Sequence, residues 1–277
     1  MVNKLREIKE VPEIQAYSYR LLVKFHDFCE ANHLRYTLAY GTLLGAVRHQ
    51  GFIPWDDDAD VIMPRPDYEK FLSMTGEKGI AADTAVIWAG NMEHPHFSYA
   101  KVIDTTTLLH ADICVPNETG LFIDVFPMDG LPDDRNEAVR HIKKCVNLVH
   151  CLELCTLKIK KGRSWMTTAL KCVALPVGRL LFKPQDVIRK SNQLAQKYPF
   201  ESSRTVAVTV YGAGSGEIVE REAFWNTVKL PFEDHSFYAP ANYDEWLTNV
   251  YGDYMALPPA AQRASTHAYE AYDRNQD

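Results

Sequence analysis

The first part of the chain repeats apolar residues at the spacing of a helix face. The repeated positions are Ile14, Tyr17, Leu21, Phe25 and Phe28. Intervals of three and four residues are typical of an amphipathic α-helix, and Pro12 suits a first helical turn. The pattern therefore predicts a helix over residues 12–34.

After residue 34, short apolar runs replace the helical spacing. Residues 35–40 are predicted as a strand that runs into Gly41-Thr42-Leu43-Leu44-Gly45-Ala46. Glycine at both ends of that segment predicts a tight turn opening a short helix. A loop over 49–55 then leads to an aspartate run and a predicted strand ending at Pro64, and residues 66–74 are predicted as a helix.

Strand-like and helical segments fill the rest of the chain. β-branched and aromatic residues predict strands over 85–89, 97–103 and 121–126. Helical patterning covers 135–160 and 165–198, with breaks expected at Gly162, Pro176 and Pro184. A hairpin over 227–238 and a helix over 243–251 follow.

These elements together predict an α/β (α+β) fold, with a mixed sheet core flanked by helices and an additional helical region. We expect a catalytic core over 1–134 and a C-terminal segment over 205–277 that packs on it. The helical region over 135–204 is expected to contact a substrate or a membrane surface.

Composition changes the picture in two ways. The net charge of −6 over 277 residues argues against a nucleic-acid partner, because nucleic acid needs a basic surface. The charged first ten residues predict no signal peptide, and the six cysteines form no C-x-x-C pair. We therefore expect a reduced, cytoplasmic chain, in which Cys151 and Cys155 are interpreted as small buried hydrophobes.

A basic segment over 158–165 leads into an apolar helical segment. Such a segment can lie on an anionic membrane surface, so peripheral contact at the inner face of the plasma membrane is one hypothesis. A solvated loop leading to a buried helix is the alternative.

The aspartate run Asp56-Asp57-Asp58-Ala59-Asp60 carries the clearest chemical signal. In a strand, alternate side chains share a face, so Asp58 and Asp60 are expected side by side, with Ala59 in the core. Adjacent carboxylates repel unless a cation lies between them, and a divalent metal with oxygen ligands is the simplest partner. A calcium loop is excluded, because Val61 and Asp67 stand where that loop needs glycine and glutamate.

A third carboxylate, Asp124, interrupts the apolar segment Leu121-Phe122-Ile123-Asp124-Val125-Phe126-Pro127. A lone buried charge costs several kcal/mol unless it is paired or bound to metal. A solvated acidic turn would explain the aspartate run alone, but it does not explain this second acidic position.

A glycine turn, an acidic-x-acidic strand and a later strand acid resemble the nucleotidyltransferase fold. More narrowly, the chain resembles the LicD family of phosphotransferases, relatives of fukutin. The matching segments are YTLAYGTLLGAVRHQGFIPWDDDADVIMPRPDYEKF, SYAKVIDTTT, LFIDVFPMDGLP and NYDEWLTNVYGDYMALPP. The segment over 135–200 carries little of this resemblance.

The resemblance implies transfer of a phospho-alcohol, most often phosphocholine from CDP-choline, to a hydroxyl of a cell-surface glycan, teichoic acid or lipopolysaccharide precursor. Two Mg²⁺ or Mn²⁺ ions would serve such a displacement, with Asp58, Asp60 and Asp124 as ligands. Asp124 would also accept the acceptor proton. Gly41, Thr42 and Gly45 are assigned to the phosphate-binding turn at a helix N-terminus.

Other residues are expected to support this site. Arg48 and Lys101 are assigned to the leaving nucleotide, and His267 is expected to reach the donor. Asp56 and Asp57 are interpreted as supporting residues, and Arg65 is expected to pair with Asp67. A quaternary ammonium needs an aromatic cage, for which the candidates are Trp55, Trp88 and Tyr99.

Three other functions use part of this pattern. A GT-A glycosyltransferase also uses an Asp-x-Asp, although it needs neither the glycine turn nor a third strand acid. A nucleotidyltransferase that transfers the nucleotide itself would use the same three acids. A catalytically inactive scaffold is the third alternative, and three intact acids argue against it.

Overall fold

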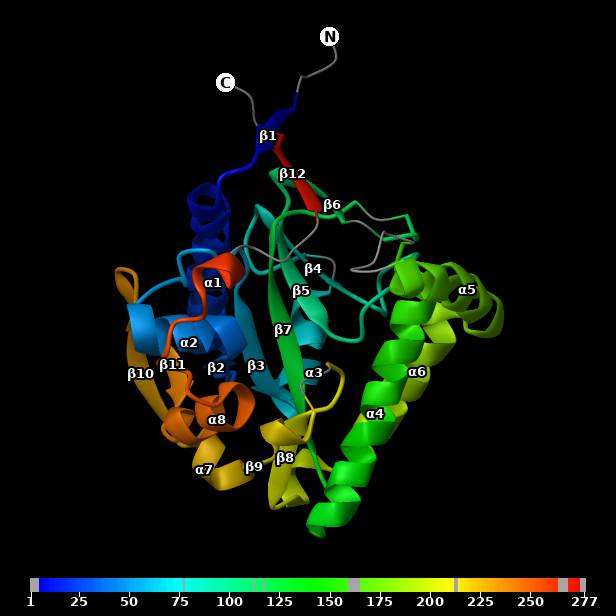
Figure 1. Ribbon diagram of the computed structural model, residues 1–277. Coiled ribbons are helices and arrows are strands. Elements are labelled where there is room, and N and C mark those ends of the chain that lie inside the picture. Colours follow the sequence, from blue (N-terminus) through cyan, green and yellow to red (C-terminus); the bar gives the residue numbers. More distant parts are fainter. Residues whose placement is uncertain are drawn as a thin grey trace.

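The central element is β7 (Phe122–Gly130), the longest strand of the main sheet (Figure 1). The computed structural model describes residues 5–76, 78–111, 113–116, 118–158, 165–211, 214–263 and 269–274. The sheet has the order β2-β3-β7-β5-β4, and β8 and β9 extend it beside the second half of β7. Only β3 and β7 pair in parallel among these described strands. The mixed sheet predicted from the sequence is therefore confirmed.

The other strands form two smaller sheets, one with the order β1-β12-β6 and one that is the hairpin β10-β11. The strands besides β7 are β1 (Arg6–Ile8), β2 (Thr37–Leu38), β3 (Asp60–Pro64), β4 (Thr84–Trp88), β5 (Ala100–Asp104), β6 (Thr107–Ala111), β8 (Thr205–Val208), β9 (Val219–Glu220), β10 (Thr227–Phe232), β11 (His235–Pro240) and β12 (Tyr269–Asp273). Because β12 pairs with β1, strands near the two ends of the chain lie side by side.

Helices pack on the main sheet, and three of them form a group to one side of it (Figure 1). They are α1 (Val11–Asn32), α2 (Tyr40–His49), α3 (Arg65–Thr75), α4 (Arg135–Thr156), α5 (Trp165–Leu181), α6 (Pro184–Ala195), α7 (Arg221–Trp225) and α8 (Tyr243–Tyr251), with short 3₁₀ turns η1 (Phe200–Ser202), η2 (Ser215–Glu217) and η3 (Ala260–Gln262). The α1 residues Leu21 and Phe25 are fully buried on the predicted face. Within the described ranges, no helix combines the length and the apolarity that crossing a membrane requires.

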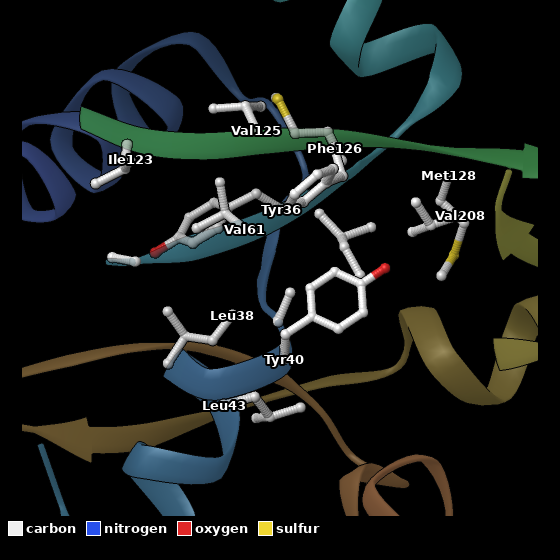
Figure 2. Packing of buried hydrophobic residues seen from close by; sticks show 14 of the residues in the cluster. Tyr36, Leu38, Tyr40, Leu43, Val61, Ile123, Val125, Phe126, Met128 and Val208 are labelled. Atoms are coloured by element: carbon white, nitrogen blue, oxygen red, sulfur yellow. The ribbon is translucent and has the colours of Figure 1, made fainter. Parts of the chain in front are cut away.

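Strand alternation directs β7 side chains to two layers of the core. Val125 and Phe126 lie on opposite sides of the strand, and Phe126 points toward Tyr40 of α2 (Figure 2). Nearly the whole length of β7 is buried, from Ile123 onward. A strand buried on both faces reads as a continuous apolar run, which is why residues 121–126 were recognisable as a strand.

The helical region α4, α5 and α6 forms one group beside the sheet (Figure 1). Leu152 and Cys155 of α4 pack against Val187 and Ile188 of α6. Cys155 is buried, which confirms its predicted role as a small apolar core residue. Cys151 is only partly buried and packs against the same cluster.

The structure corrects several predicted boundaries. Pro176 lies inside α5 rather than breaking it, whereas Pro184 begins α6 as expected. The strand after the aspartate run starts at Asp60, so Asp58 precedes it. The strands β1, β6, β8, β9 and β12 were not predicted, because each is short and pairs mainly with distant segments. The break expected at Gly162 lies outside the described residues.

Candidate functional site

Strand register places two carboxylates and one ammonium in a single row across the sheet. Asp60 of β3 is the register partner of Asp124 of β7, and Asp124 is the register partner of Lys101 of β5. Register partners point to the same face of a sheet. The structure thus brings together three predicted site residues that are as far as 64 positions apart in the sequence.

The first carboxylate of the row, Asp60, lies in an unfavourable electrostatic environment. Its exposed fraction is 9%. Burial raises the pKa of Asp60 well above its usual range, and the negative charges of Asp58, Asp124 and Asp56 raise it further. The nearby Asp58 therefore contributes to the same negative site, although it precedes the strand rather than alternating with Asp60 on it. The predicted place of Ala59 in the core is confirmed, because its side chain is fully buried.

The second carboxylate, Asp124, is held by the ammonium of Lys101. The Lys101 Nζ donates to Asp124 Oδ1 at 2.5 Å, and both side chains are about nine-tenths buried. The same ammonium lies 3.3 Å from the centre of the Phe122 ring, a cation–π contact. The buried charge that the sequence placed in an apolar strand is therefore paired, as its cost requires.

Two hydrogen bonds attach the start of α2 to the backbone of Asp60. The Asp60 N–H donates to Thr42 Oγ1 at 2.8 Å, and the Ala39 N–H donates to the Asp60 carbonyl oxygen at 3.0 Å. Thr42 is buried. The structure thus places the predicted phosphate-binding turn directly beside Asp60, with the Thr42 hydroxyl accepting a hydrogen bond from the strand.

The two glycines of α2 face other parts of the protein at very short range. A Cβ at Gly41 would lie 2.4 Å from Asp56 Oδ2, and a Cβ at Gly45 would lie 2.4 Å from the Gly51 carbonyl oxygen. Gly45 is therefore needed for the close approach of backbone to backbone. The assignment of Gly45 to a phosphate-binding turn stays a prediction.

Replacing Thr42 by valine is expected to lower the free energy of unfolding by about 1–3 kcal/mol, because the buried Asp60 N–H loses its acceptor. Serine keeps the hydroxyl, so Thr42→Ser is the matched control and should lose less. Urea unfolding followed by circular dichroism measures both. Equal losses in the two variants would contradict a role for the hydroxyl.

Aromatic rings line the same face next to the carboxylates. Phe126 lies two residues after Asp124 on β7, Tyr99 directly precedes β5, and the ring centres of Tyr99 and Phe126 are 4.5 Å apart. Tyr211, which follows β8, has its ring centre 4.9 Å from that of Phe126 and 6.0 Å from that of Tyr99. Tyr211 keeps 43% of its surface exposed, so a ligand can reach this group.

The nearby acids affect the two phenols Tyr99 and Tyr211. Burial raises the pKa of both phenols, and the charges of Asp60, Asp124 and Asp58 contribute to each increase. The predicted cage residue Tyr99 thus lies at the site. Tyr211 was missed, because no spacing in the sequence connects the end of β8 with β5 or β7.

Two further tyrosines near the acids were also missed. Burial and the charges of Asp60 and Asp56 raise the pKa of Tyr251, at the end of α8. The Tyr269 hydroxyl donates to Asp57 Oδ2 at 2.8 Å, which ties the aspartate run to β12. Tyr251 lies in one of the segments that carry the family resemblance, and this was the available signal for it.

Arg48 and Trp55 belong to a second group. Arg48 Nη1 donates to the Tyr254 carbonyl oxygen at 2.7 Å, and its Nε donates to His49 Nε2 at 3.0 Å. Burial and the charge of Arg263 lower the pKa of Arg48. Arg263 itself lies 5.6 Å from the centre of the Trp55 ring. This group joins the end of α2 to the C-terminal segment.

Trp88 and Arg65 have their contacts outside these two groups. Trp88 is the register partner of Ala100 and packs against the main core. His267 lies outside the described residues. The predicted pair of Arg65 and Asp67 is wrong: Arg65 pairs with Asp129, whereas Asp67 accepts hydrogen bonds from Arg35.

The donor set fits a hard divalent cation in its chemistry. Asp58, Asp60 and Asp124 supply only carboxylate oxygens, the ligands that Mg²⁺ and Mn²⁺ prefer, and their mutual charge raises the pKa of Asp60. Among the described residues, no three His, Cys, Asp or Glu side chains are already grouped in a metal-holding arrangement. Asp124 instead contacts Lys101.

Comparison with known proteins finds one matching family and several similar proteins. Residues 33–143 match the family described as "LicD/FKTN/FKRP, nucleotidyltransferase domain", a range that contains Thr42, Asp60, Lys101 and Asp124. The chain is 30% identical over 269 residues to the lipopolysaccharide cholinephosphotransferase LicD of Haemophilus influenzae, covering 94% of this chain and 97% of that protein. Uncharacterized proteins of Rickettsia prowazekii and Rickettsia typhi are each 51% identical over 43 residues, covering 16% of this chain and 16% and 14% of those proteins.

Proposed function

The chain belongs to the LicD family, and from this premise we propose that it transfers phosphocholine from CDP-choline to a hydroxyl of a cell-surface glycan precursor such as lipopolysaccharide. The observation that carries the proposal is the row of Asp60, Asp124 and Lys101 across three strands, next to the rings of Tyr99 and Tyr211. Acids for phosphate chemistry and rings for a quaternary ammonium thus lie on one face.

In the proposed step, the acceptor oxygen attacks the phosphorus atom that carries choline. A new P–O bond forms to the acceptor, the P–O bond to CMP breaks, and CMP leaves with the bonding electrons. Asp124 accepts the proton of the acceptor hydroxyl, and Lys101 holds this carboxylate in position through its 2.5 Å contact. The first turn of α2 would offer backbone N–H groups to phosphate oxygens.

Asp58, Asp60 and Asp124 would hold Mg²⁺ or Mn²⁺, which neutralises phosphate charge when bound. We propose that two ions bind, because two metal ions serve a displacement at phosphorus. Dialysis against EDTA is expected to abolish turnover, and added Mg²⁺ or Mn²⁺ should restore it. Full turnover after exhaustive EDTA treatment would contradict the metal assignment.

A second candidate is transfer of the nucleotide itself, because the matched family is described as a nucleotidyltransferase domain. The products distinguish the two reactions. The purified chain, incubated with CDP-choline, Mg²⁺ and a lipopolysaccharide-type acceptor, should release CMP. Release of pyrophosphate from CTP without CMP release from CDP-choline would support the second candidate.

The aromatic group yields a prediction about which alcohol is carried. Tyr211→Ala is expected to raise the KM for CDP-choline about 2- to 30-fold, since a cation–π contact contributes about 0.5–2 kcal/mol. Tyr211→Phe keeps the ring and is the matched control. The KM for CDP-glycerol, which carries no cation, should change less than the KM for CDP-choline. Equal changes for both donors would exclude a choline-binding role for Tyr211.

A further inference from the structure

The helix α5 presents an apolar face to solvent. Val173, Val177, Leu180 and Leu181 are 65%, 46%, 85% and 66% exposed. Val173, Val177 and Leu180 follow one another at intervals of four and three residues, so they lie on one side of the helix. Soluble surfaces scatter such residues singly, whereas a continuous group marks a binding surface.

The opposite side of α5 accounts for its attachment to the protein. Leu175 is buried, α5 packs against α4, and Phe182 packs on the cluster formed by α4 and α6. Arg179 Nη2 also donates to the Leu157 carbonyl oxygen at 2.6 Å. This packing therefore does not involve the exposed face and does not account for its apolar residues.

The charge around this face is strongly asymmetric. Residues 135–200 contain 14 lysines and arginines against three acidic residues, in a chain whose totals are 30 and 36. Among the described side chains, Lys143, Lys144, Lys183, Arg189 and Lys190 are all exposed. An acidic protein thus concentrates its positive charge in the region that carries the exposed apolar face.

We propose that α5 docks on the surface of an anionic lipid membrane, with the apolar face at the level of the acyl chains and the basic residues of the region at the headgroups. Exposed valine and leucine gain by leaving water, and each lysine or arginine near an anionic surface adds attraction. The proposal rests on exposure and charge, and it does not depend on the phosphocholine reaction.

Two other occupants fit less well. A second copy would bring an equally basic region against this one, and like charges repel. Nucleic acid would match the positive charge, but its phosphates would not bury the four exposed apolar side chains. An anionic lipid surface complements both features together.

Vesicle flotation of the full chain tests the proposal. The probes are vesicles of phosphatidylcholine alone and vesicles of phosphatidylcholine with an equal amount of phosphatidylglycerol. The unmodified chain should float with the anionic vesicles only, and high salt should weaken this binding because it screens the basic residues. The double variant V173S/L180S should lose binding by about ten-fold or more.

A matched control carries serine at exposed apolar positions far from α5 in the sequence. Met74 and Val228 are 42% and 38% exposed, so M74S/V228S should float like the unmodified chain. Charge reversal in K183E/K190E should also weaken binding, although Val173 and Leu180 are unchanged in this variant. Circular dichroism and urea unfolding show that each variant is folded.

Several outcomes would overturn the proposal. These are unchanged flotation of V173S/L180S, equal binding to neutral vesicles, and binding of a duplex oligonucleotide in preference to vesicles. A concentration-dependent dimer that V173S/L180S abolishes in the absence of lipid would assign the face to a second copy instead. If the unmodified chain floats with anionic vesicles but releases no CMP, the result contradicts the proposed reaction and not the proposed membrane docking.

Discussion

Replacement of Asp60 or Asp124 by asparagine is expected to lower CMP release by about 10³-fold or more, because each variant removes a carboxylate from the site where phosphate charge is handled. Asp133→Asn changes an exposed acid in the loop before α4 and serves as the matched control with near-normal turnover. Near-normal activity of Asp60→Asn or Asp124→Asn would remove that residue from the proposed machinery.

The two variants should differ in stability. Burial and the charges of Asp58 and Asp124 raise the pKa of Asp60 in the folded chain. A raised carboxyl pKa means that the folded state favours the protonated form, so this contribution to stability is present at low pH and is lost as the pH rises through the folded pKa. Asp60→Asn removes the charge, and in EDTA at neutral pH its free energy of unfolding should equal or exceed that of the unmodified chain.

Asp124→Asn should have the opposite effect. Lys101 is buried, and Asp124 is its ion-pair partner. A buried charge that loses its partner costs about 3–5 kcal/mol, so Asp124→Asn should lower the free energy of unfolding in the same EDTA buffer. Urea titration of both variants measures this contrast. A gain for Asp124→Asn, or a loss of that size for Asp60→Asn, would contradict the charge arrangement described here.

A second large loss of stability is expected from breaking the buried pair of Arg65 and Asp129. Arg65 Nε and Nη2 donate to the two carboxylate oxygens of Asp129 at 2.7 and 2.8 Å, and Thr209 Oγ1 donates to Asp129 Oδ2 at 2.9 Å. Arg65→Met leaves a carboxylate that is 1% exposed without its cation. The free energy of unfolding should fall by about 3–5 kcal/mol.

An exposed pair provides the control for this experiment. Arg189 and Asp186 are 60% and 53% exposed, so Arg189→Met should cost less than about 1 kcal/mol. Arg65→Lys should also lose stability, because a lysine cannot form the two parallel hydrogen bonds of the guanidinium. An Arg65→Met loss no larger than that of Arg189→Met would show that the pair contributes little.

Local patterns predicted many of the elements correctly. The apolar spacing of residues 12–34 corresponds to α1, and the hairpin predicted over 227–238 corresponds to β10 and β11. Strand alternation predicted that Ala59 is buried between two acids that share a site. These predictions succeeded because helix periodicity, alternation and turn chemistry act between residues close together in the chain.

Pairing between distant residues could not be predicted in the same way. Arg65 was assigned to Asp67, two residues away, but its partner is Asp129 on β7. Tyr211 joins Tyr99 and Phe126 only because the end of β8 lies beside β7. No local rule selects among partners that are tens of residues apart, since their distance depends on how the strands align.

The sequence by itself determined the membership in the LicD family, the mixed α/β class and the acids Asp58, Asp60 and Asp124 as the candidate site. Only the tertiary structure decided that Asp60, Asp124 and Lys101 form one row, and that α5 leaves an apolar face exposed. The physical reason is that residue type and spacing set local chemistry, whereas strand register and helix packing depend on contacts made by the whole chain.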